Sequence, residues 1–401
     1  LLACYDGENI FADKSGRHII AAYGDRQSTL TQSLNNSPIG ITTENPGLIR
    51  DTDPLAGPTF QGGAGFVSQG WLTLPKGTTE ERIPNFATNA VHHGSARGIW
   101  GGGLQDSPVA SLSTIQYITI STLGDFTDFG ELTEDRYGNG ALASGTRALW
   151  AAGLSAPSPV YYNVIDYVEI ASTGDAKDFG DITYGVPYYT AGVSNATRGI
   201  WGGGYNTPSS PQVPSPYPSG FQNEMEYITI ASKGNAKDFG DFTARNSHAT
   251  LGSPTRGVFA GGATPTKVNN IEHITISTTG NALEFGDLIT ARNYGVGCSN
   301  SVRGIIAGGS TPTMINSIEY VTIAASGNGQ DFGDLTATKS ELGACSSSTR
   351  GVIGGGWSPA KIDEMDYIHF ATTGNAVAFG ELDHVGVYQE QGTSNGHGGL
   401  G

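Results

Sequence analysis

Residues 303–336 read RGIIAGGSTPTMINSIEYVTIAASGNGQDFGDLT. Within this stretch, IEYVTI alternates apolar and polar side chains with a period of two, which is typical of a β-strand with one buried face. Glycine and asparagine separate it from the arginine-led segment before it and from the phenylalanine-containing segment after it, and these residues favour turns. The stretch therefore predicts three short strands joined by turns.

The same pattern occurs six times, in copies spaced 47 to 58 residues apart. The copies begin at Arg97, Arg147, Arg198, Arg256, Arg303 and Arg350. An apolar segment that ends in small and polar residues comes before each arginine, so one unit predicts a four-stranded antiparallel meander. A meander of this size cannot bury both of its faces alone. We therefore expect an all-β fold in which several meanders pack around an axis as the blades of a β-propeller.

The clear repeats cover residues 87–383, and the two ends of the chain decide the number of blades. Residues 386–401 resemble another first strand followed by a shortened second one. Residues 65–86 can supply the remaining strands, and pairing the two ends removes exposed sheet edges. We predict seven blades over residues 65–401, with six blades and an extra C-terminal strand as the alternative. Residues 1–64 do not repeat, and we expect an irregular arm there.

Composition and charge exclude several classes of function. The chain has 401 residues, of which 60 are glycine, and its formal net charge is -16. Nucleic acids and anionic membrane surfaces require a basic footprint, so we expect neither as a partner. No apolar run approaches the roughly 20 residues of a membrane-spanning helix, so we expect no membrane insertion.

The repeat resembles two known groups of proteins. The order of hydrophobic strand, glycine doublet and two aromatic-containing strands is similar to the kelch repeat, although phenylalanine stands where kelch repeats usually carry tryptophan in the fourth strand. The sequence pattern TRGxxxGG followed by IEYITIASTGNAxDFGDLT resembles the sequences of repetitive virion proteins of tailed bacteriophages, especially cyanophages. The segment TLPKGTTEER, which starts at Thr73, is similar to segments of phage fibre proteins.

The resemblance implies an extracellular virion protein without enzymatic activity. It would be a fibre or tail appendage that attaches to a host-surface glycan or protein, and residues 1–64 would contact other virion proteins. Oligomerisation is compatible with this role. One alternative is a capsid decoration protein or a self-assembling filament subunit. A second alternative is a propeller glycoside hydrolase, which needs two carboxylates about 5–10 Å apart. The acidic residues lie mostly at repeat-equivalent positions, so no such pair stands out.

Charged residues that recur in every copy favour a structural role. Acidic residues recur in the third strand, at Asp166, Glu226, Glu272, Glu319 and Asp366. A catalytic centre needs one constellation rather than six copies of it. We therefore predict that the six repeated arginines form internal bridges to these carboxylates or bind backbone carbonyls.

We predict no metal site and no cofactor. The two carboxylates of one DFGD segment, such as Asp178 and Asp181, lie three residues apart, and strict strand alternation places them on opposite faces. The histidines lack the spacing of metal ligands. Cys298 and Cys345 precede Arg303 and Arg350 by five residues, at a position that is apolar elsewhere in the repeat, so we expect them to pack in the core.

Loops that interrupt the repeat are the best candidates for binding. In a four-stranded meander, the loops between strands 2 and 3 and between one blade and the next emerge on the same face. Three such loops carry tyrosine and proline, and tyrosine offers rigid amphipathic contact area for sugars or proteins. The candidate binding residues are Tyr161, Tyr162, Tyr184, Tyr188, Tyr189, Tyr205 and Tyr217. The alternative is that these side chains only pack the loops onto their neighbours.

Overall fold

The structure is a computed structural model that describes residues 5–6, 9–13, 96–185, 187–207, 219–358, 363–382 and 387–400. The chain divides into two units, Leu1–Val91 and His92–Gly401. In the first unit, strands β1 (Tyr5–Asp6) and β2 (Asn9–Asp13) pair antiparallel. The rest of the predicted arm and the predicted closing strands in residues 65–86 lie outside the described residues.

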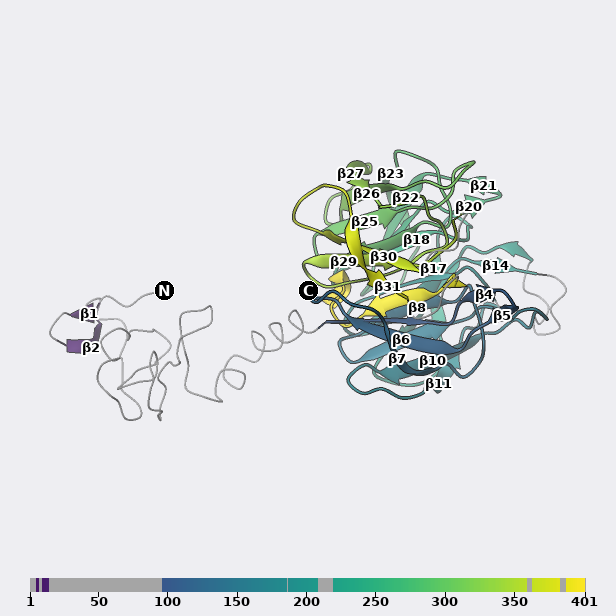
Figure 1. The fold of residues 1–401 in the computed structure, drawn as a ribbon, viewed down its shortest axis with the longest axis horizontal. Helices are drawn as coiled ribbons and strands as arrows, with labels where there is room; N and C mark the ends of the chain where they lie inside the picture. Colours follow the sequence, from purple (N-terminus) through teal and green to yellow (C-terminus); the bar gives the residue numbers. More distant parts are fainter. Residues whose placement is uncertain are drawn as a thin grey trace. The chain divides into compact units, whose positions relative to one another are not determined.

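The second unit consists of four-stranded antiparallel sheets, numbered here 1 to 6 (Figure 1). Sheet 1 contains β33 (Gln391–Ser394), β3 (Arg97–Gly101), β6 (Thr114–Thr119) and β7 (Thr127–Glu131). Sheet 2 contains β8 (Gly140–Ala143), β9 (Arg147–Ala151), β10 (Val164–Glu169) and β11 (Lys177–Asp181). Sheet 3 contains β12 (Ala191–Ser194), β13 (Arg198–Gly202), β16 (Glu224–Thr229) and β17 (Lys237–Asp241).

The other three sheets repeat the same order. Sheet 4 contains β18 (Ala249–Gly252), β19 (Arg256–Ala260), β22 (Asn270–Thr275) and β23 (Leu283–Asp287). Sheet 5 contains β24 (Val296–Ser299), β25 (Arg303–Ala307), β26 (Ser317–Thr322) and β27 (Gln330–Asp334). Sheet 6 contains β28 (Gly343–Ser346), β29 (Arg350–Gly354), β30 (Glu364–His369) and β31 (Val377–Glu381). The predicted four-stranded meander is thus confirmed in the five copies that form sheets 2 to 6, whereas the copy that begins at Arg97 takes its first strand from the C-terminal end.

Short strands also lie in the loops, most of them between the second and third strands of a sheet. They are β4 (Leu104–Asp106), β5 (Val109–Ser111), β14 (Tyr205–Asn206), β15 (Gly220–Phe221), β20 (Ala263–Thr264), β21 (Thr266–Lys267) and β32 (Val387–Tyr388). A single turn of 3-10 helix, η1 (Gly398–Leu400), ends the described chain. None of the described segments is a helix long and apolar enough to cross a membrane.

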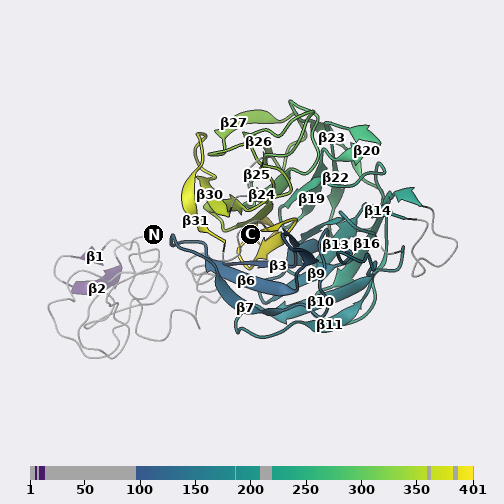
Figure 2. The same cartoon turned by 45° about the vertical axis from the view of Figure 1, so that its right-hand side comes forward.

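The C-terminal strand supplies the first strand of sheet 1. β33 pairs with β3, and its neighbours among the inner strands are β28 of sheet 6 and β8 of sheet 2. The inner strands therefore follow one another in a cycle, which gives a propeller-like arrangement of the six sheets (Figure 2). This differs from our preferred prediction of a seventh blade begun by residues 386–401. β33 occupies the place of the first strand in sheet 1, and the strands predicted to complete a seventh blade lie outside the described residues.

The repeated arginines connect each sheet to the next. Arg97 in sheet 1 donates from Nη1 to the carbonyl oxygen of Ile170 in sheet 2, at 2.8 Å. Equivalent bonds join every later pair of neighbours, and Arg350 in sheet 6 donates to Ile120 in sheet 1, at 3.0 Å. In five of the six copies the guanidinium also lies 4.3–4.6 Å from the ring centre of a third-strand tyrosine. The prediction of backbone carbonyl partners is confirmed.

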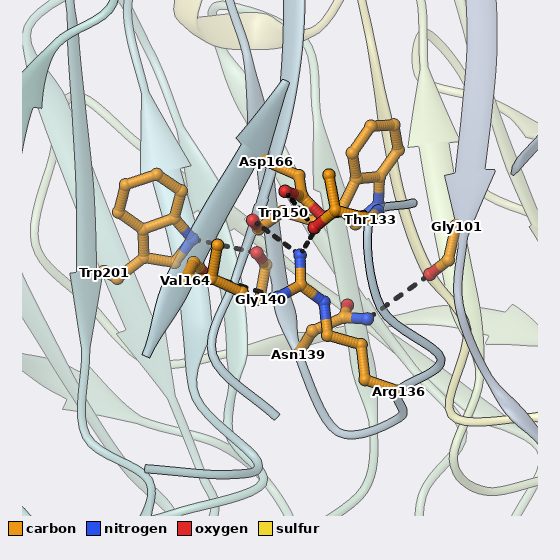
Figure 3. Close-up of polar contacts among 9 residues, drawn as sticks. All are labelled: Gly101, Thr133, Arg136, Asn139, Gly140, Trp150, Val164, Asp166 and Trp201. Atoms are coloured by element: carbon orange, nitrogen blue, oxygen red, sulfur yellow. Dashed lines mark hydrogen bonds and ion pairs between the residues drawn. The ribbon is translucent and has the colours of Figure 1, made fainter. Parts of the chain in front are cut away.

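Arg147 pairs with one third-strand acid, Glu169, at 2.8 Å, but among the described residues the repeated arginines form no ion pair with the repeated third-strand carboxylates. The carboxylates pair instead with a cation from the loop that enters their own sheet, as in Arg136–Asp166 at 2.8 Å. Figure 3 shows the Arg136 guanidinium between Asp166 and the carbonyl oxygens of Trp150 and Val164. The equivalent pairs are Arg245–Glu272, Arg292–Glu319 and Lys339–Asp366. The repeated arginines instead use Nη1 to reach the next sheet, as Arg147 does with Ile230 O at 3.0 Å.

The outer edge of each sheet docks on a turn of its neighbour. Gly174 donates its backbone N–H to Phe129 O at 2.8 Å, and Asp175 accepts a bond from the N–H of Glu131. A Cβ atom on Gly130 would lie 2.6 Å from Gly174, so the close approach requires glycine. The fourth strand is bulged beside this glycine in every sheet. Strict alternation, on which we separated the two carboxylates of DFGD, therefore does not hold across this strand.

Apolar side chains fill the spaces between neighbouring sheets. Trp100, Trp150 and Trp201 are fully buried, and Trp201 donates from its indole nitrogen to Gly140 O of the preceding sheet, at 2.9 Å. Each cluster joins side chains from two adjacent sheets, so no sheet buries its faces alone. Cys298 and Cys345 are buried free thiols within this packing, as predicted. Cys4 lies outside the described residues.

Candidate functional site

The loops between strands 2 and 3 and the loops between successive sheets lie together, as predicted. Isolated bridges connect the two kinds of loop, for example Tyr137 with Leu154 and Tyr188 with Tyr205. The ribbons β4–β5, β14–β15 and β20–β21 arise from the same loops. We call this side of the second unit the loop face; the hairpins between strands 1 and 2 lie on the opposite side.

A ring of six residues in the left-handed backbone conformation surrounds the axis on the loop face. We call it the mouth ring, and it contributes one residue per sheet. Its members are Gly138, Tyr189, Ser247, Tyr294, Glu341 and Gln389, with φ between 55° and 67°. Each of the last five donates its backbone N–H to the carbonyl oxygen of the member before it, at 2.7–3.1 Å. The inter-sheet bonds hold a backbone conformation that costs an ordinary L-residue roughly 1 kcal/mol.

The mouth ring opens into a cavity along the axis. The cavity has a volume of about 110 Å³ and is lined by the inner strands of the six sheets. Its lining extends from mouth-ring residues such as Tyr294 to His397 near the C-terminus. Small side chains and glycine dominate the inner strands, which leaves room for several water molecules or for the end of a small ligand.

The C-terminal segment fills the opposite end of the channel. The His397 imidazole lies with Nε2 2.9 Å from Ala143 O. A Cβ atom on Gly398 would lie 2.3 Å from the carbonyl oxygens of both Gly252 and Asn300, so the segment crosses between sheets 4 and 5 in direct backbone contact. Burial lowers the pKa of His397, so its imidazole is neutral in this place. The cavity therefore approaches solvent at the mouth ring.

Five tyrosines form a continuous aromatic cluster at the mouth, which we call the tyrosine cluster. Its members are Tyr161, Tyr188, Tyr189, Tyr205 and Tyr294, linked by ring-centre distances of 4.9–5.9 Å. All five are partly exposed, and Tyr205 also packs edge-on against Phe221 at 5.1 Å. Desolvation by burial raises the pKa of Tyr188 to about 12, so this phenol is neutral at ordinary pH.

The structure brings together four of the seven predicted tyrosines. Tyr184 instead belongs to the core, where its hydroxyl donates to Gly203 O at 2.8 Å. Tyr162 is partly exposed but makes no ring contact with the cluster among the described residues. Tyr217 lies outside the described residues. Packing onto neighbouring loops and exposure for binding thus occur together, because the same rings contact one another and remain open to solvent.

Sequence reasoning missed Tyr294, Glu341 and Gln389. Each follows the position that carries the buried cation, or its replacement, by two residues: Tyr294 follows Arg292, and Gln389 follows Val387. Tyr189 has the same offset from Pro187. The signal that could have found the ring is its constant distance from the RG arginine: in five copies the member lies nine residues before it, as Tyr294 does before Arg303.

Glu341 is the only carboxylate in the cavity lining, and no lysine or arginine lines the cavity within the described chain. Gln389 donates from Nε2 to the Glu341 carboxylate and to the Tyr189 hydroxyl. Desolvation raises the pKa of Glu341 above its ordinary value, although the bond from Gln389 opposes this. His248, which also lines the cavity, lies beside Arg245, and burial with this charge lowers its pKa to about 3. The electrostatics of the mouth therefore depend on Glu341.

Several buried polar atoms of the described lining lack a hydrogen-bond partner, including both ring nitrogens of His248 and the hydroxyl of Ser247. Two of them are amide oxygens, Oε1 of Gln389 and Oδ1 of Asn139, on side chains that are 6 % and 1 % exposed. A buried acceptor without a donor is costly, so a ligand that donates hydrogen bonds would be favoured here. Among the described residues, no three His, Cys, Asp or Glu side chains group into a metal site.

Comparison with protein-family models and with curated proteins finds no match for this chain. The candidate site accordingly rests on the geometry of the mouth ring and of the tyrosine cluster.

Proposed function

We propose that the protein is a non-enzymatic binding component of a bacteriophage virion, a fibre or tail appendage that uses its loop face to attach to a glycan on the host surface. The tyrosine cluster around the mouth ring carries this proposal. Partly exposed tyrosines present flat apolar faces with hydroxyl groups at their edges, and sugars present apolar C–H faces edged with hydroxyls. The virion and its extracellular location come from the resemblance of the repeats to phage proteins.

We also propose that the second unit is a closed, kelch-like β-propeller with six blades. The cyclic order of the inner strands and the bond from Arg350 in sheet 6 to Ile120 in sheet 1 support this interpretation. A rigid ring would hold the loops in place, so the loop face would be preformed before binding. In this proposal residues 1–64 would contact other virion proteins.

The absence of a paired acid at the mouth favours binding over hydrolysis. A glycoside hydrolase uses two carboxylates that flank the bond to be broken. In the described part of the cavity lining, Glu341 has no second carboxylate beside it. The loop face would therefore bind without cleaving.

A host-adsorption assay and a glycan array test this function with matched variants. We expect Tyr188→Ala and Tyr161→Ala each to reduce binding by about tenfold or more. An aromatic face that a ligand covers contributes about 1–2 kcal/mol to the binding free energy. Tyr162→Ala is the control, because it removes a neighbouring tyrosine outside the cluster. Unchanged adsorption and unchanged array binding for the two cluster variants would contradict the proposal.

A further inference from the structure

We infer that the mouth ring is a subsite for a compact organic cation, an alkylammonium or a protonated primary amine carried at the end of the ligand. The inference rests on the proposed function of the loop face as a binding surface and specifies the chemistry that its centre recognises. Either an amino sugar or a choline-type headgroup would provide this cation. The ammonium group is the feature that the two share.

The charge distribution around the cavity favours a cation. Glu341 belongs to the mouth ring itself, and no described lysine or arginine lines the cavity. The described residues also contain no ion pair to Glu341. Its carboxylate is half-buried, so its interaction with a cation is screened less than at an open surface. An anionic ligand would meet the same carboxylate and be repelled.

Aromatic faces stand beside this carboxylate. Tyr189 and Tyr294 meet edge to face, with ring centres 5.5 Å apart and planes at 82°, which forms a corner at the mouth. Tyr188 packs on Tyr189 at 4.9 Å and extends the aromatic wall. Gln389 donates to both the Glu341 carboxylate and the Tyr189 hydroxyl, and the Glu341 N–H donates to Tyr294 O at 2.9 Å, so Glu341 lies beside both tyrosines. Tyrosine faces attract organic cations through the ring quadrupole, and desolvation strengthens this attraction.

The buried acceptors complete the fit to an ammonium group. Gln389 donates to Glu341 and Tyr189, which fixes its amide so that Oε1 remains without a donor. Asn139 Oδ1 also lines the cavity without a donor. A protonated amine offers three N–H donors, whereas a quaternary ammonium would satisfy the aromatic corner and the charge alone. The subsite therefore combines charge, aromatic faces and acceptors.

Direct titration of the full chain tests the inference. The probes are glucosamine and tetramethylammonium chloride, compared with glucose and N-acetylglucosamine as neutral sugars, and binding is followed by calorimetry and by NMR. We expect glucosamine to bind at least about tenfold more tightly than either neutral sugar, which corresponds to about 1.4 kcal/mol. Glu341→Gln should remove this preference and leave the affinity for glucose unchanged.

Two further variants keep the result interpretable. Glu284→Gln removes an exposed carboxylate from the outer strand β23 and should leave the preference for glucosamine intact. Tyr294→Leu retains Glu341 but removes an aromatic wall, so it should weaken tetramethylammonium binding by about fivefold or more. Because it does not alter the carboxylate, it tests the subsite even where Glu341→Gln fails to fold.

The outcomes separate this inference from the proposed function. Equal affinity for glucosamine and glucose, or a preference that survives Glu341→Gln, would overturn the cation subsite while leaving glycan attachment in place. If neither cationic probe binds but the tyrosine-cluster variants still reduce host adsorption, the inference again fails alone. If the cations bind as expected and those variants leave adsorption unchanged, the subsite stands and the proposed attachment function fails.

Discussion

The contacts between neighbouring sheets, which we call the joints, and the mouth ring are built from the same six repeats. The repeats keep the side chain the same at the joints, but only the backbone conformation the same at the mouth ring. At the joints, every copy uses the same side chain for the same bond, from Arg97 and Ile170 around to Arg350 and Ile120. At the mouth, every copy uses the same backbone conformation, but the side chains are those of glycine, tyrosine, serine, glutamate and glutamine. Because the ring is held by backbone bonds, its side chains can vary without loss of the fold.

At a third group of positions, the same side-chain pairing occurs in most sheets but not in all of them. Four sheets hold a buried cation against the third-strand carboxylate. Sheet 3 has Pro187 at the cation position, and its Glu226 accepts bonds from the backbone and hydroxyl of Thr183, as Asp166 of sheet 2 does from Thr133 in addition to its cation. Sheet 1 has Val387 there and replaces the acid with Gln116. The buried ion pair is therefore one of several arrangements found at this third-strand position.

The largest expected effect distinguishes the two kinds of arginine. Arg292→Leu would leave the buried Glu319 carboxylate without its partner and should lower the free energy of unfolding by about 3–5 kcal/mol. Arg303→Leu removes a carbonyl bond and a stacking contact with Tyr320, so we expect a loss of about 1–2 kcal/mol. Urea unfolding measures both. Equal losses would mean that the joints and the buried pairs contribute alike.

The second prediction concerns the pH dependence of stability in sheet 1. Glu390 is buried, and desolvation raises its pKa to about 8, although a bond from Gln116 opposes the shift. The folded protein therefore holds a proton here that the unfolded chain releases between about pH 4.5 and 8, so stability falls as the pH rises through that window. The loss at pH 7 is at most roughly 3 kcal/mol.

Glu390→Gln tests this directly, because the amide cannot ionise. We expect the variant to be more stable than the parent at pH 8 and to have a flatter profile of unfolding free energy between pH 5 and 8. The exposed Glu284→Gln provides the control and should leave the profile unchanged. A parent whose stability rises steadily across this range would contradict a protonated Glu390.

The smallest expected effect tests the backbone of the mouth ring. Gly138→Ala puts a side chain in the left-handed region, and its Cβ would lie 3.2 Å from the Tyr189 ring, so we expect a loss of about 1 kcal/mol. Ser247→Gly should change the unfolding free energy by less than about 0.5 kcal/mol, because relief of the backbone offsets the greater freedom of the unfolded chain. A large loss for Ser247→Gly would show that the serine side chain, rather than the backbone, holds the ring.

Much of the fold could be predicted from the repeats, but two assignments depended on partners that are remote in sequence. The arginine of RG and the third-strand acid recur together in the repeats, and this favoured the prediction of an ion pair between them. The true cation, such as Arg136, lies in a loop of variable length and is present in four copies only. Likewise, nothing in residues 391–394 shows whether they begin a new sheet or complete the first one.

The sequence by itself determined the strands, their order within each meander and the shared face of the loops, because alternation and turn residues act over a few neighbouring positions. Only the tertiary structure decided which strand completes sheet 1, which cation meets which carboxylate, and which side chains surround the channel. Those outcomes depend on contacts between residues up to 298 positions apart, such as the bond from the Arg97 N–H to the Asn395 side chain. The mouth ring belongs to this second group, since its six members, one from each sheet, meet only when the six sheets pack together.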